Sequence, residues 1–238
     1  MSDLAVLLPG YNVARHLGDL VPRIRRELPD ADLILVDDGS GDGTAHVATE
    51  LGVHVEIHPV NRGKGVALRT GFDAALRREA GAVITMDADG QHLPSEAHRF
   101  VEAWRAGAHV VVGNRMAATA DMPWLRKRTN EFTSFVISRL AGAHIPDSQN
   151  GYRLFDAAVL RAVDLESERY DLESEILIKA AALGFTVTDV PITTVYGDEI
   201  SSIHPFADTV RFVRLVARTG RWRRHPGTRA RKADAEPQ

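Results

Sequence analysis

Two aspartates near the middle of the sequence, Asp87 and Asp89, have the type and spacing that could do chemistry. They directly follow the apolar residues 83–86, and Gly90 lets the chain turn away, which is typical of the carboxyl end of a buried strand. Alternate residues of an extended chain point to the same side, so we expect both carboxylates to face one point. Such oxygen donors suit Mg²⁺ or Mn²⁺ carrying a substrate diphosphate. A solvated acidic turn would show the same pattern, so the pair needs support from other residues.

Polar residues also follow three other apolar runs of the sequence. Pro9-Gly10-Tyr11-Asn12 follows residues 4–8, Asp37-Asp38 follows residues 33–36, and Gly113-Asn114-Arg115 follows residues 110–112. Ligands of open parallel sheets bind outside the carboxyl ends of the strands. We therefore expect these groups to meet the aspartate pair at one edge of a sheet.

Strands and helices alternate through the part of the chain that must position these groups. Apolar runs predict strands at residues 4–8, 33–36, 53–57, 83–86 and 110–112, and helical spacing of apolar residues predicts helices at 14–28, 42–51, 66–78 and 95–105. This order indicates βαβ units, and so an α/β fold with an open, mainly parallel sheet flanked by helices. Further helices are predicted at 122–140, 173–183 and 206–220, and a last strand at 185–192.

Composition excludes several classes of protein. Of the 238 residues, 44% are hydrophobic and 26% are charged, which is typical of a globular domain. The net charge of −3 gives no general attraction to nucleic acid, and the lack of cysteine excludes disulfides and zinc–thiolate sites. The sequence shows neither a signal peptide nor an apolar run of about 20 residues that could span a bilayer. We expect a cytoplasmic protein.

Both common phosphate-binding loops are missing from the sequence. A Rossmann dinucleotide site needs Gly-x-Gly-x-x-Gly after the first strand, where this chain has one glycine, Gly10. A P-loop needs Ser or Thr after its lysine, but Lys64 is followed by Gly65. This leaves a diphosphate held mainly through a metal ion on Asp87 and Asp89, as a leaving group with the metal as Lewis acid.

Six stretches in order along the chain resemble motifs of family 2 glycosyltransferases. They are Pro9 to Asn12, Asp37-Asp38-Gly39-Ser40, Asn61-Arg62-Gly63-Lys64-Gly65, Asp87-Ala88-Asp89-Gly90-Gln91-His92, Gly113-Asn114-Arg115 and Asp147-Ser148-Gln149-Asn150-Gly151-Tyr152-Arg153. The resemblance covers about residues 4–195 and is strongest to the branch that transfers mannose or glucose to polyprenyl (dolichyl) phosphates. It implies the GT-A fold, a nucleoside-diphosphate sugar donor of the GDP-mannose or UDP-glucose type, and inversion at the anomeric carbon.

The resemblance also implies roles on the donor side. Pro9, Tyr11 and Asn12 would line the nucleoside pocket, Asp37 and Asp38 would address base and ribose, and Ala88 would border the donor. Asp87, Asp89 and Gln91 would hold Mg²⁺ or Mn²⁺, with Asp89 counted as catalytic, and Lys64 would meet the diphosphate. The alternatives are structural roles: Asp37 and Asp38 would cap a helix, Lys64 would be a solvated loop lysine, and His92 would be a loop histidine.

On the acceptor side, the resemblance implies that Arg115, Gln149 and Arg153 bind the acceptor, with Arg115 also counted as catalytic. Arg153 could instead be a structural ion-pair partner. A lipid phosphate is already ionised and needs little or no general base, whereas a hydroxyl acceptor would need one. Asp147 is the first candidate for that base, with Glu131 behind it. The polyprenyl-phosphate branch often carries a Ser-Lys pair near residues 198–204, but the lysine is absent here, and Ser201, Ser202 or His204 could substitute.

The resulting hypothesis is one catalytic domain over residues 1–225, with a donor half at about 1–115, an acceptor half at about 116–220 and a disordered tail at 226–238. The acceptor is a polyprenyl phosphate or, alternatively, a hydroxyl of a saccharide or small molecule. A nucleotidyltransferase would need a Gly-rich loop with Arg and Lys after the first strand, and a non-catalytic binding module would not need the metal pair. A basic face on the helix at 206–220 could place the protein peripherally at the inner face of a membrane.

Overall fold

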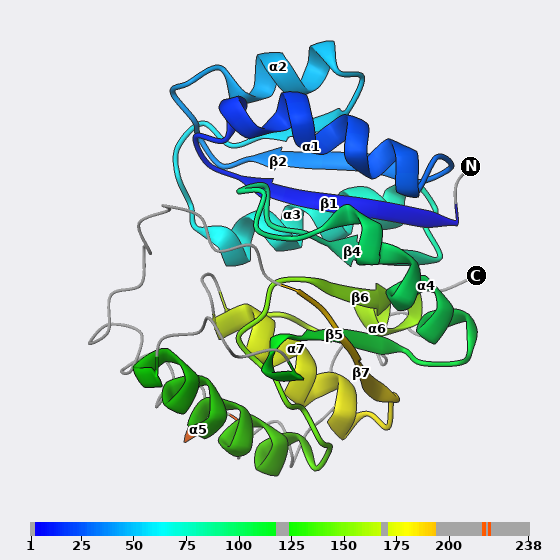
Figure 1. Ribbon diagram of the computed structural model, residues 1–238, viewed down its shortest axis with the longest axis vertical. Helices are drawn as coiled ribbons and strands as arrows, with labels where there is room; N and C mark the ends of the chain where they lie inside the picture. The colour runs from blue at the N-terminus through cyan, green and yellow to red at the C-terminus, as the bar shows by residue number, and fades with distance from the viewer. Residues whose placement is uncertain (1–2, 118–123, 168–170, 194–215, 218, 220–238) are drawn as a thin grey trace, which may run out of the picture.

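A single sheet of seven strands runs through the computed structural model, which describes residues 3–117, 124–167, 171–193, 216–217 and 219 (Figure 1). The strand order is β3-β2-β1-β4-β6-β5-β7, and every neighbouring pair is parallel except the two that involve β6. The strands are β1 (Leu4–Gly10), β2 (Asp32–Asp37), β3 (His54–Ile57), β4 (Ala82–Thr85), β5 (Val110–Asn114), β6 (Arg153–Asp156) and β7 (Val187–Pro191).

Helices cover both faces of this sheet (Figure 1). Side chains of α1, α2 and α4 pack on one face, and side chains of α3, α5, α6 and α7 pack on the other. The α-helices are α1 (Ala14–Glu27), α2 (Thr44–Glu50), α3 (Lys64–Arg77), α4 (Ala97–Arg105), α5 (Trp124–Ala141), α6 (Ala157–Ala162) and α7 (Asp171–Ala182), and two 3₁₀ turns are η1 (Pro94–Glu96) and η2 (Arg115–Ala117).

The continuous apolar runs of the sequence form strands because both faces of the sheet are buried. In β1, Ala5 and Leu7 enter the core under α3, whereas Val6 and Leu8 enter the core under α1. All four side chains are buried, and burying one Val or Leu stabilises the fold by about 1.5–3 kcal/mol. A strand of this kind has no polar face, which explains why alternation is absent from the sequence of β1.

The short strand β6 joins the two halves of the chain. It lies between β4 and β5 and pairs antiparallel with both, so that Leu154 is opposite Ile84 on one side and Val111 on the other. Because β6 runs against its neighbours, its amino end lies beside their carboxyl ends. The loop before it, residues 147–152, is therefore delivered to the edge where the predicted strand ends meet.

Most predicted elements are present with shifted ends. Helix α3 begins at Lys64 and not at residue 66, because Gly63 precedes it with φ +94°, a conformation that favours glycine. The helix predicted at 95–105 divides into η1 and α4, and α6 was not predicted. The helix predicted at 206–220 lies outside the described residues except at 216, 217 and 219, and the tail at 226–238 also lies outside them.

Among the described residues, no helix combines the length and the apolar character needed to cross a bilayer.

Candidate active site at the carboxyl edge of the sheet

The loops after β1 and β2 are tied to each other at the carboxyl edge. The backbone N–H of Asn12 donates to Ser40 Oγ (2.8 Å), and the backbone N–H of Ser40 donates to Asp37 Oδ1 (2.9 Å). Asn12 has a left-handed φ of +55°, and the neighbouring Tyr11 is exposed. Pro9 is the penultimate residue of β1. The two loops that carry the predicted nucleoside-pocket residues are therefore held together by hydrogen bonds.

Asp38 is buried and holds the segment that leads into α3. Its carboxylate accepts from the backbone N–H groups of Arg62 (2.9 Å) and Gly63 (2.8 Å), and His58 Nδ1 lies 2.7 Å from Oδ1. The predicted alternative of a cap for the next helix along the chain is wrong for Asp38, because α2 is capped by Asp42, which accepts from the first N–H of that helix (3.0 Å). Asp38 instead anchors the amino end of α3.

Lys64, the first residue of α3, lies between two carboxylates from distant segments. Its Nζ is 2.7 Å from Asp87 Oδ1 and 3.3 Å from Glu173 Oε1. Burial by itself would lower the pKa of Lys64, but the charges of Asp87 and Glu173 outweigh burial and raise that pKa above its ordinary value. Burial would likewise raise the pKa of Asp87, but the Lys64 charge outweighs it and lowers that pKa to about 2. The alternative of a solvated loop lysine is therefore wrong.

Asp89 is a carboxylate whose charged form a nearby cation would stabilise. Burial and then the negative charge of Asp87 raise the pKa of Asp89 above its ordinary value. The backbone N–H of Gln91 donates to Asp89 Oδ1 (2.9 Å), and Ala88, between the two aspartates, points into the core. Mg²⁺ commonly takes one or two carboxylates and completes its shell with water and substrate phosphate oxygens. Asp87 and Asp89 are the two carboxylates that such an ion takes, and among the described residues no group of three or more His, Asp or Glu could hold a metal ion.

His92 is a buried support of this loop, which its sequence position did not reveal. The backbone N–H of Asp87 donates to His92 Nδ1 (3.1 Å), and the imidazole stacks on Tyr152 with 5.0 Å between ring centroids. Burial lowers the pKa of His92, which favours the neutral imidazole, and the bond from Asp87 makes Nδ1 the acceptor nitrogen. Tyr152 stacks in turn on Phe100 of α4. His92 therefore lies in a loop, as predicted, but it is buried and has partners that the sequence did not indicate.

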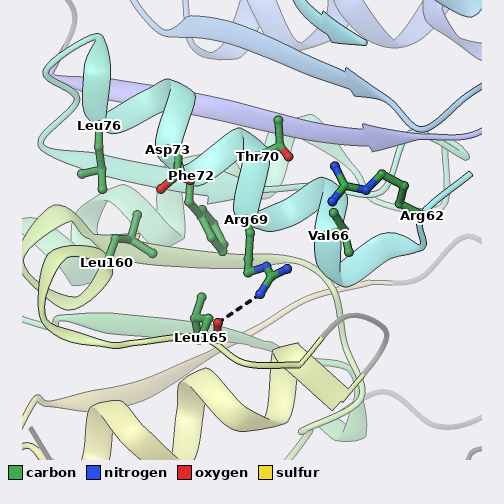
Figure 2. A pocket seen from close by; sticks show the side chains of 9 residues that line it. All are labelled: Arg62, Val66, Arg69, Thr70, Phe72, Asp73, Leu76, Leu160 and Leu165. Carbon is green, nitrogen blue, oxygen red and sulfur yellow. Dashed lines mark hydrogen bonds between the residues drawn. The ribbon is translucent and has the colours of Figure 1, made fainter. Parts of the chain in front are cut away.

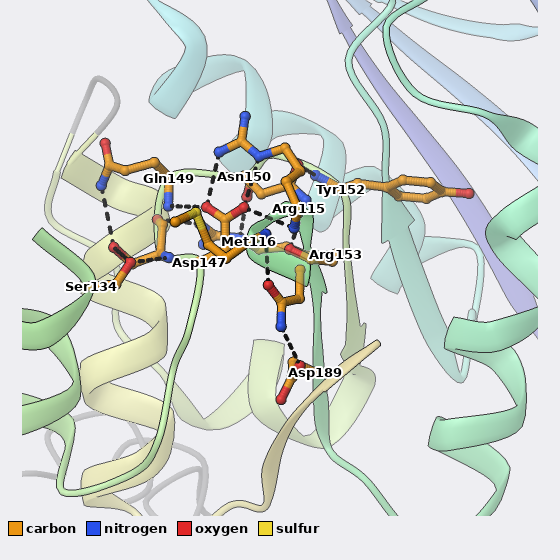
Figure 3. A network of polar contacts seen from close by, with 12 residues as sticks. Arg115, Met116, Ser134, Asp147, Gln149, Asn150, Tyr152, Arg153 and Asp189 are labelled. Carbon is orange, nitrogen blue, oxygen red and sulfur yellow. Dashed lines mark hydrogen bonds and ion pairs between the residues drawn. The ribbon is translucent and has the colours of Figure 1, made fainter. Parts of the chain in front are cut away.

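Arg115 and Asp147 form a closed ion pair at the end of β5 (Figure 3). Arg115 Nε donates to Asp147 Oδ2 (2.7 Å) and Nη2 donates to Oδ1 (2.9 Å), while the Arg115 backbone N–H also donates to Oδ2 (3.1 Å). The Asp147 side chain has no exposed surface. In this structure its carboxylate is closed to an incoming acceptor, which speaks against the predicted role of general base. Glu131, the second candidate, pairs with Arg128 on α5 (3.2 Å).

Arg153 is buried inside the protein and binds three backbone carbonyl groups, two from the loop before β6 and one from α7. Its Nε donates to the carbonyl of Asn150 (2.7 Å), Nη1 to that of Glu173 (2.5 Å) and Nη2 to that of Ser148 (2.8 Å). The residue is 1% exposed, so it offers no surface to an acceptor. The predicted acceptor contact is corrected to a structural role, although its partners are carbonyl groups and not the ion-pair partner considered as the alternative.

The loop before β6 packs directly against the donor-side charges. A Cβ on Gly151 would lie 2.7 Å from Asp87 Oδ2 and 2.8 Å from Lys64 Nζ, so any other residue there would displace these two charged side chains. Thr85 Oγ1 donates to the carbonyl of Gly151 (2.8 Å), which ties the loop to β4. Gln149, predicted on the acceptor side, has an exposed side chain in the same loop. Gly151 and Glu173 are thus site residues that were not among the predicted ones.

A family model described as glycosyl transferase family 2 matches residues 5–164, a segment that contains all six of the motifs. The chain belongs to glycosyl transferase family 2.

Relatives of this glycosyltransferase carry names from the predicted branch. It is 35% identical over 204 residues to polyprenol monophosphomannose synthase of Mycolicibacterium smegmatis, covering 79% of this chain and 76% of that protein. It is 34% identical over 200 residues to undecaprenyl-phosphate mannosyltransferase of Micrococcus luteus, covering 79% and 82%. The predicted family and branch resemblance are thereby confirmed, and the nucleotidyltransferase alternative is excluded.

Solved structures confirm the predicted GT-A fold of this glycosyltransferase. Glucosyl-3-phosphoglycerate synthase of Mycobacterium tuberculosis, solved with Mn²⁺, UDP and phosphoglyceric acid, superposes with a TM-score of 0.69 at 20% identity over 92% of this chain and 78% of that one. Mannosyl-3-phosphoglycerate synthase of Rubrobacter xylanophilus superposes with a TM-score of 0.68 at 20% identity over 99% and 76%.

A groove beside α3 is separate from the site of this glycosyltransferase. It has a volume of about 240 Å³, and Arg69 Nη1 crosses it to the carbonyl of Leu165 (3.1 Å; Figure 2). None of the predicted site residues lines it. The lining residues are Arg62, Val66, Arg69, Thr70, Phe72, Asp73, Leu76, Leu160 and Leu165. Ser201, Ser202 and His204, predicted as substitutes for the missing lysine, lie outside the described residues.

Proposed function

We propose that this glycosyltransferase moves a hexose from a nucleoside-diphosphate sugar, of the GDP-mannose or UDP-glucose type, to the phosphate of a polyprenyl phosphate. The reaction inverts the anomeric carbon and depends on Mg²⁺ or Mn²⁺. The observation that carries the proposal is the carboxylate pair at the end of β4, with Lys64 2.7 Å from Asp87 and a raised pKa on Asp89. The names of the relatives support the lipid acceptor.

On the donor side, Asp87, Asp89 and Gln91 would hold the metal ion. A bound divalent cation supplies Lewis-acid chemistry, in that it neutralises the diphosphate leaving group. Lys64 brings a second positive charge to the same point, and the amino end of α3 favours an anion there. The nucleoside would lie along the surface of the hydrogen-bonded loops after β1 and β2.

That nucleoside surface is formed by Pro9, Tyr11, Asn12 and Asp37, with the backbone at Ala88 beside it. Asp38 contributes by anchoring the loop before α3, because its carboxylate already accepts hydrogen bonds from Arg62 and Gly63. We therefore propose a positioning role for Asp38 in place of a direct contact with ribose.

The transfer step needs no proton transfer at the acceptor. The bond between the anomeric carbon and the diphosphate oxygen breaks, and a bond from the same carbon to a phosphate oxygen of the acceptor forms on the opposite face. An ionised phosphate has no proton to lose, so no general base is required. The burial of Asp147 in its pair with Arg115 favours this acceptor over a hydroxyl, because a hydroxyl acceptor would need that carboxylate free.

Of the two arginines predicted on the acceptor side, Arg115 is the less buried (7% exposed against 1% for Arg153), so we assign it to the acceptor phosphate, with Asp147 orienting it. Arginine recognises phosphate through planar, charge-assisted hydrogen bonds, and a carboxylate partner fixes the plane of its guanidinium. Gln149 in the neighbouring loop is an additional acceptor contact. Since a polyprenyl phosphate resides in a bilayer, we place the enzyme peripherally at the inner face of the membrane.

The donor half of the proposal is tested by thermal unfolding with GDP, UDP and dTDP, each with Mn²⁺ or with EDTA. A ligand at 100 times its Kd should raise the Tm by about 5–10 °C. We expect this rise for one nucleotide and only with metal, which would identify the donor. No rise with any nucleotide would contradict the donor assignment.

The acceptor half is tested by transfer of radiolabelled sugar to undecaprenyl phosphate, with undecaprenol and a simple saccharide as matched acceptors. Transfer should require the phosphate group. Transfer to undecaprenol or to the saccharide at a comparable rate would show that the acceptor is a hydroxyl and would overturn this half of the proposal.

A further inference from the structure

Helix α5 exposes three large aromatic side chains. Trp124, Phe132 and Phe135 are 69%, 64% and 63% exposed, and they make up half of the large hydrophobic residues that the described part of the chain leaves exposed. The others, Tyr11, Ile57 and Val60, belong to separate loops and a strand edge. Single exposed hydrophobic residues are ordinary, whereas a group on one helix marks an interaction surface.

These three aromatic residues share one side of α5 with two arginines. At about 100° per residue, positions 124, 128, 132, 135 and 139 fall within about 80° of one another. We call this side the α5 outer face: Trp124, Arg128, Phe132, Phe135 and Arg139. The Arg128 guanidinium lies 6.0 Å from the centroid of the Trp124 ring, so cationic and aromatic groups are already associated on it.

All three aromatic residues of α5 lie on its outer face, and its buried side carries Asn130, Ser134, Ile137 and Ala141. Asn130 and Ser134 are buried there together with Ile137, and the Oγ of Ser134 accepts from the backbone N–H of Ser148 (2.9 Å). A helix that only packs on a core places its apolar side inward. In α5 the aromatic side faces outward, which implies that something apolar covers it in the working protein.

We propose that the α5 outer face docks the protein on an anionic lipid bilayer. Aromatic rings at the level of the headgroups, flanked by arginines, are the chemistry of a helix lying in a membrane interface. Juxtamembrane cations are attracted to anionic lipid, although the protein as a whole carries a net charge of −3. Arg128 also pairs with Glu131 (3.2 Å), but this pair is screened by solvent, and Arg139 is exposed on the same face.

Docking on the α5 outer face would place the acceptor side of the site directly behind α5, one helix away from the headgroups. The inner side of α5 is bonded to Ser148, and the adjacent Asp147 holds Arg115 at 2.7 Å. Figure 1 shows α5 as the outermost helix of its layer, with α7 between it and the sheet. The inference rests on the proposed function only in that a lipid acceptor gives the protein a reason to dock. Docking itself can be tested without any transfer reaction.

The test is flotation of the full chain with vesicles of phosphatidylglycerol and, in parallel, of phosphatidylcholine. We expect binding to phosphatidylglycerol vesicles and at least a tenfold loss of it in the double variant Phe132→Ser/Phe135→Ser. The matched control is Ile57→Ser/Val60→Ser, which removes two side chains of equal exposure (64% and 63%) elsewhere and should bind like the wild type. Arg128→Glu should weaken binding to the anionic vesicles more than to the neutral ones. The Tm of each variant checks that it is folded.

Three results would overturn the proposal: no binding by the wild type, equal binding by the α5 double variant, or equal loss in both double variants. If the α5 variant changes the oligomeric state in light scattering but not flotation, the face is a contact between copies of the chain and the bilayer proposal is wrong.

Failure of docking and failure of the proposed function are distinguishable by the acceptor used. A short-chain, water-soluble prenyl phosphate should be a substrate for the α5 double variant with unchanged kcat/KM, while transfer to vesicle-borne undecaprenyl phosphate falls. Loss with both acceptors would place the residues in the site and contradict docking. No transfer by the wild type to either acceptor would refute the proposed function and leave the flotation result to stand or fall by itself.

Discussion

At the scale of single residues, each aspartate of the site has a different environment. Asp87 lies 2.7 Å from the Nζ of Lys64, Asp147 is closed by Arg115, and Asp89 has a raised pKa that a cation would lower. These differences separate a carboxylate that can bind a metal ion from one that orients an arginine. We therefore expect different effects when each is replaced by asparagine: a loss of activity for Asp89 and a loss of stability for Asp147.

Asp89→Asn should lower sugar transfer by at least about 100-fold and leave the Tm unchanged, because the variant removes a metal-binding charge that the fold itself does not need. The measurement is transfer rate against Mn²⁺ concentration, together with a melting curve. Asp19→Asn, at an exposed position on α1, is the matched control. Full activity in Asp89→Asn would rule out the metal assignment.

Asp147→Asn should lower the free energy of unfolding by roughly 3–5 kcal/mol, because it leaves the buried Arg115 guanidinium without its counter-charge. The double variant Arg115→Met/Asp147→Leu should recover much of that loss, since no charge is then left unpaired. Urea unfolding of the single and double variants measures both. If Asp147→Asn instead retains full stability and loses only activity, the pair is not structural and a catalytic base must be reconsidered.

At the scale of elements, the loop of residues 147–152 determines how the donor and acceptor sides meet. The antiparallel β6 directs this loop to the carboxyl ends of β4 and β5, where Gly151 packs on Asp87. Arg153, the first residue of β6, then bonds this loop to the first turn of α7 through the carbonyl of Glu173. The site therefore depends on a buried arginine that touches neither substrate in our proposal.

Arg153→Met should destabilise the protein by roughly 3–5 kcal/mol, because three buried carbonyl groups lose a charged donor together. We expect a lower urea midpoint and faster hydrogen exchange in residues 148–151. Arg105→Met on the exposed end of α4 is the control and should change stability by less than about 0.5 kcal/mol. Wild-type stability in Arg153→Met, combined with a raised KM for the acceptor, would restore the acceptor role.

At the scale of the whole molecule, the donor and acceptor halves share one sheet. Strand β6, from the acceptor half, lies between β4 and β5 of the donor half, so neither half has a complete sheet by itself. The predicted division into halves therefore describes the sequence order of the binding residues and not two units of the sheet.

A chain of residues 1–116 should not fold into a monomer. Without β6, the apolar strand β4 becomes an open edge and β5 loses its partners, and an exposed apolar edge strand promotes aggregation. We expect insoluble or aggregated protein by size-exclusion chromatography, and recovery of a soluble complex when residues 117–238 are co-expressed. A cooperatively unfolding monomer of residues 1–116 would show that the donor half is independent.

The patterns that were predicted correctly are local. The strands β1, β2, β4 and β5 are runs of apolar residues, and their polar ends are read directly from neighbouring positions. The features that were missed join distant segments. His92 stacks on Tyr152, and Lys64 pairs with Glu173, at separations along the chain that no local pattern reports.

The α/β class, the family and the polar groups at the strand ends could be predicted from the amino-acid sequence. These features depend on the spacing of apolar residues, on turn residues and on the order of motifs along the chain. Which of those polar groups are paired with another residue and which face outward depends on the tertiary structure. Asp147 and Arg153 have the residue types of a base and a phosphate ligand, but burial and hydrogen bonding commit both to the fold. Burial and pairing depend on contacts between segments, and those contacts exist only once β6 has entered the sheet.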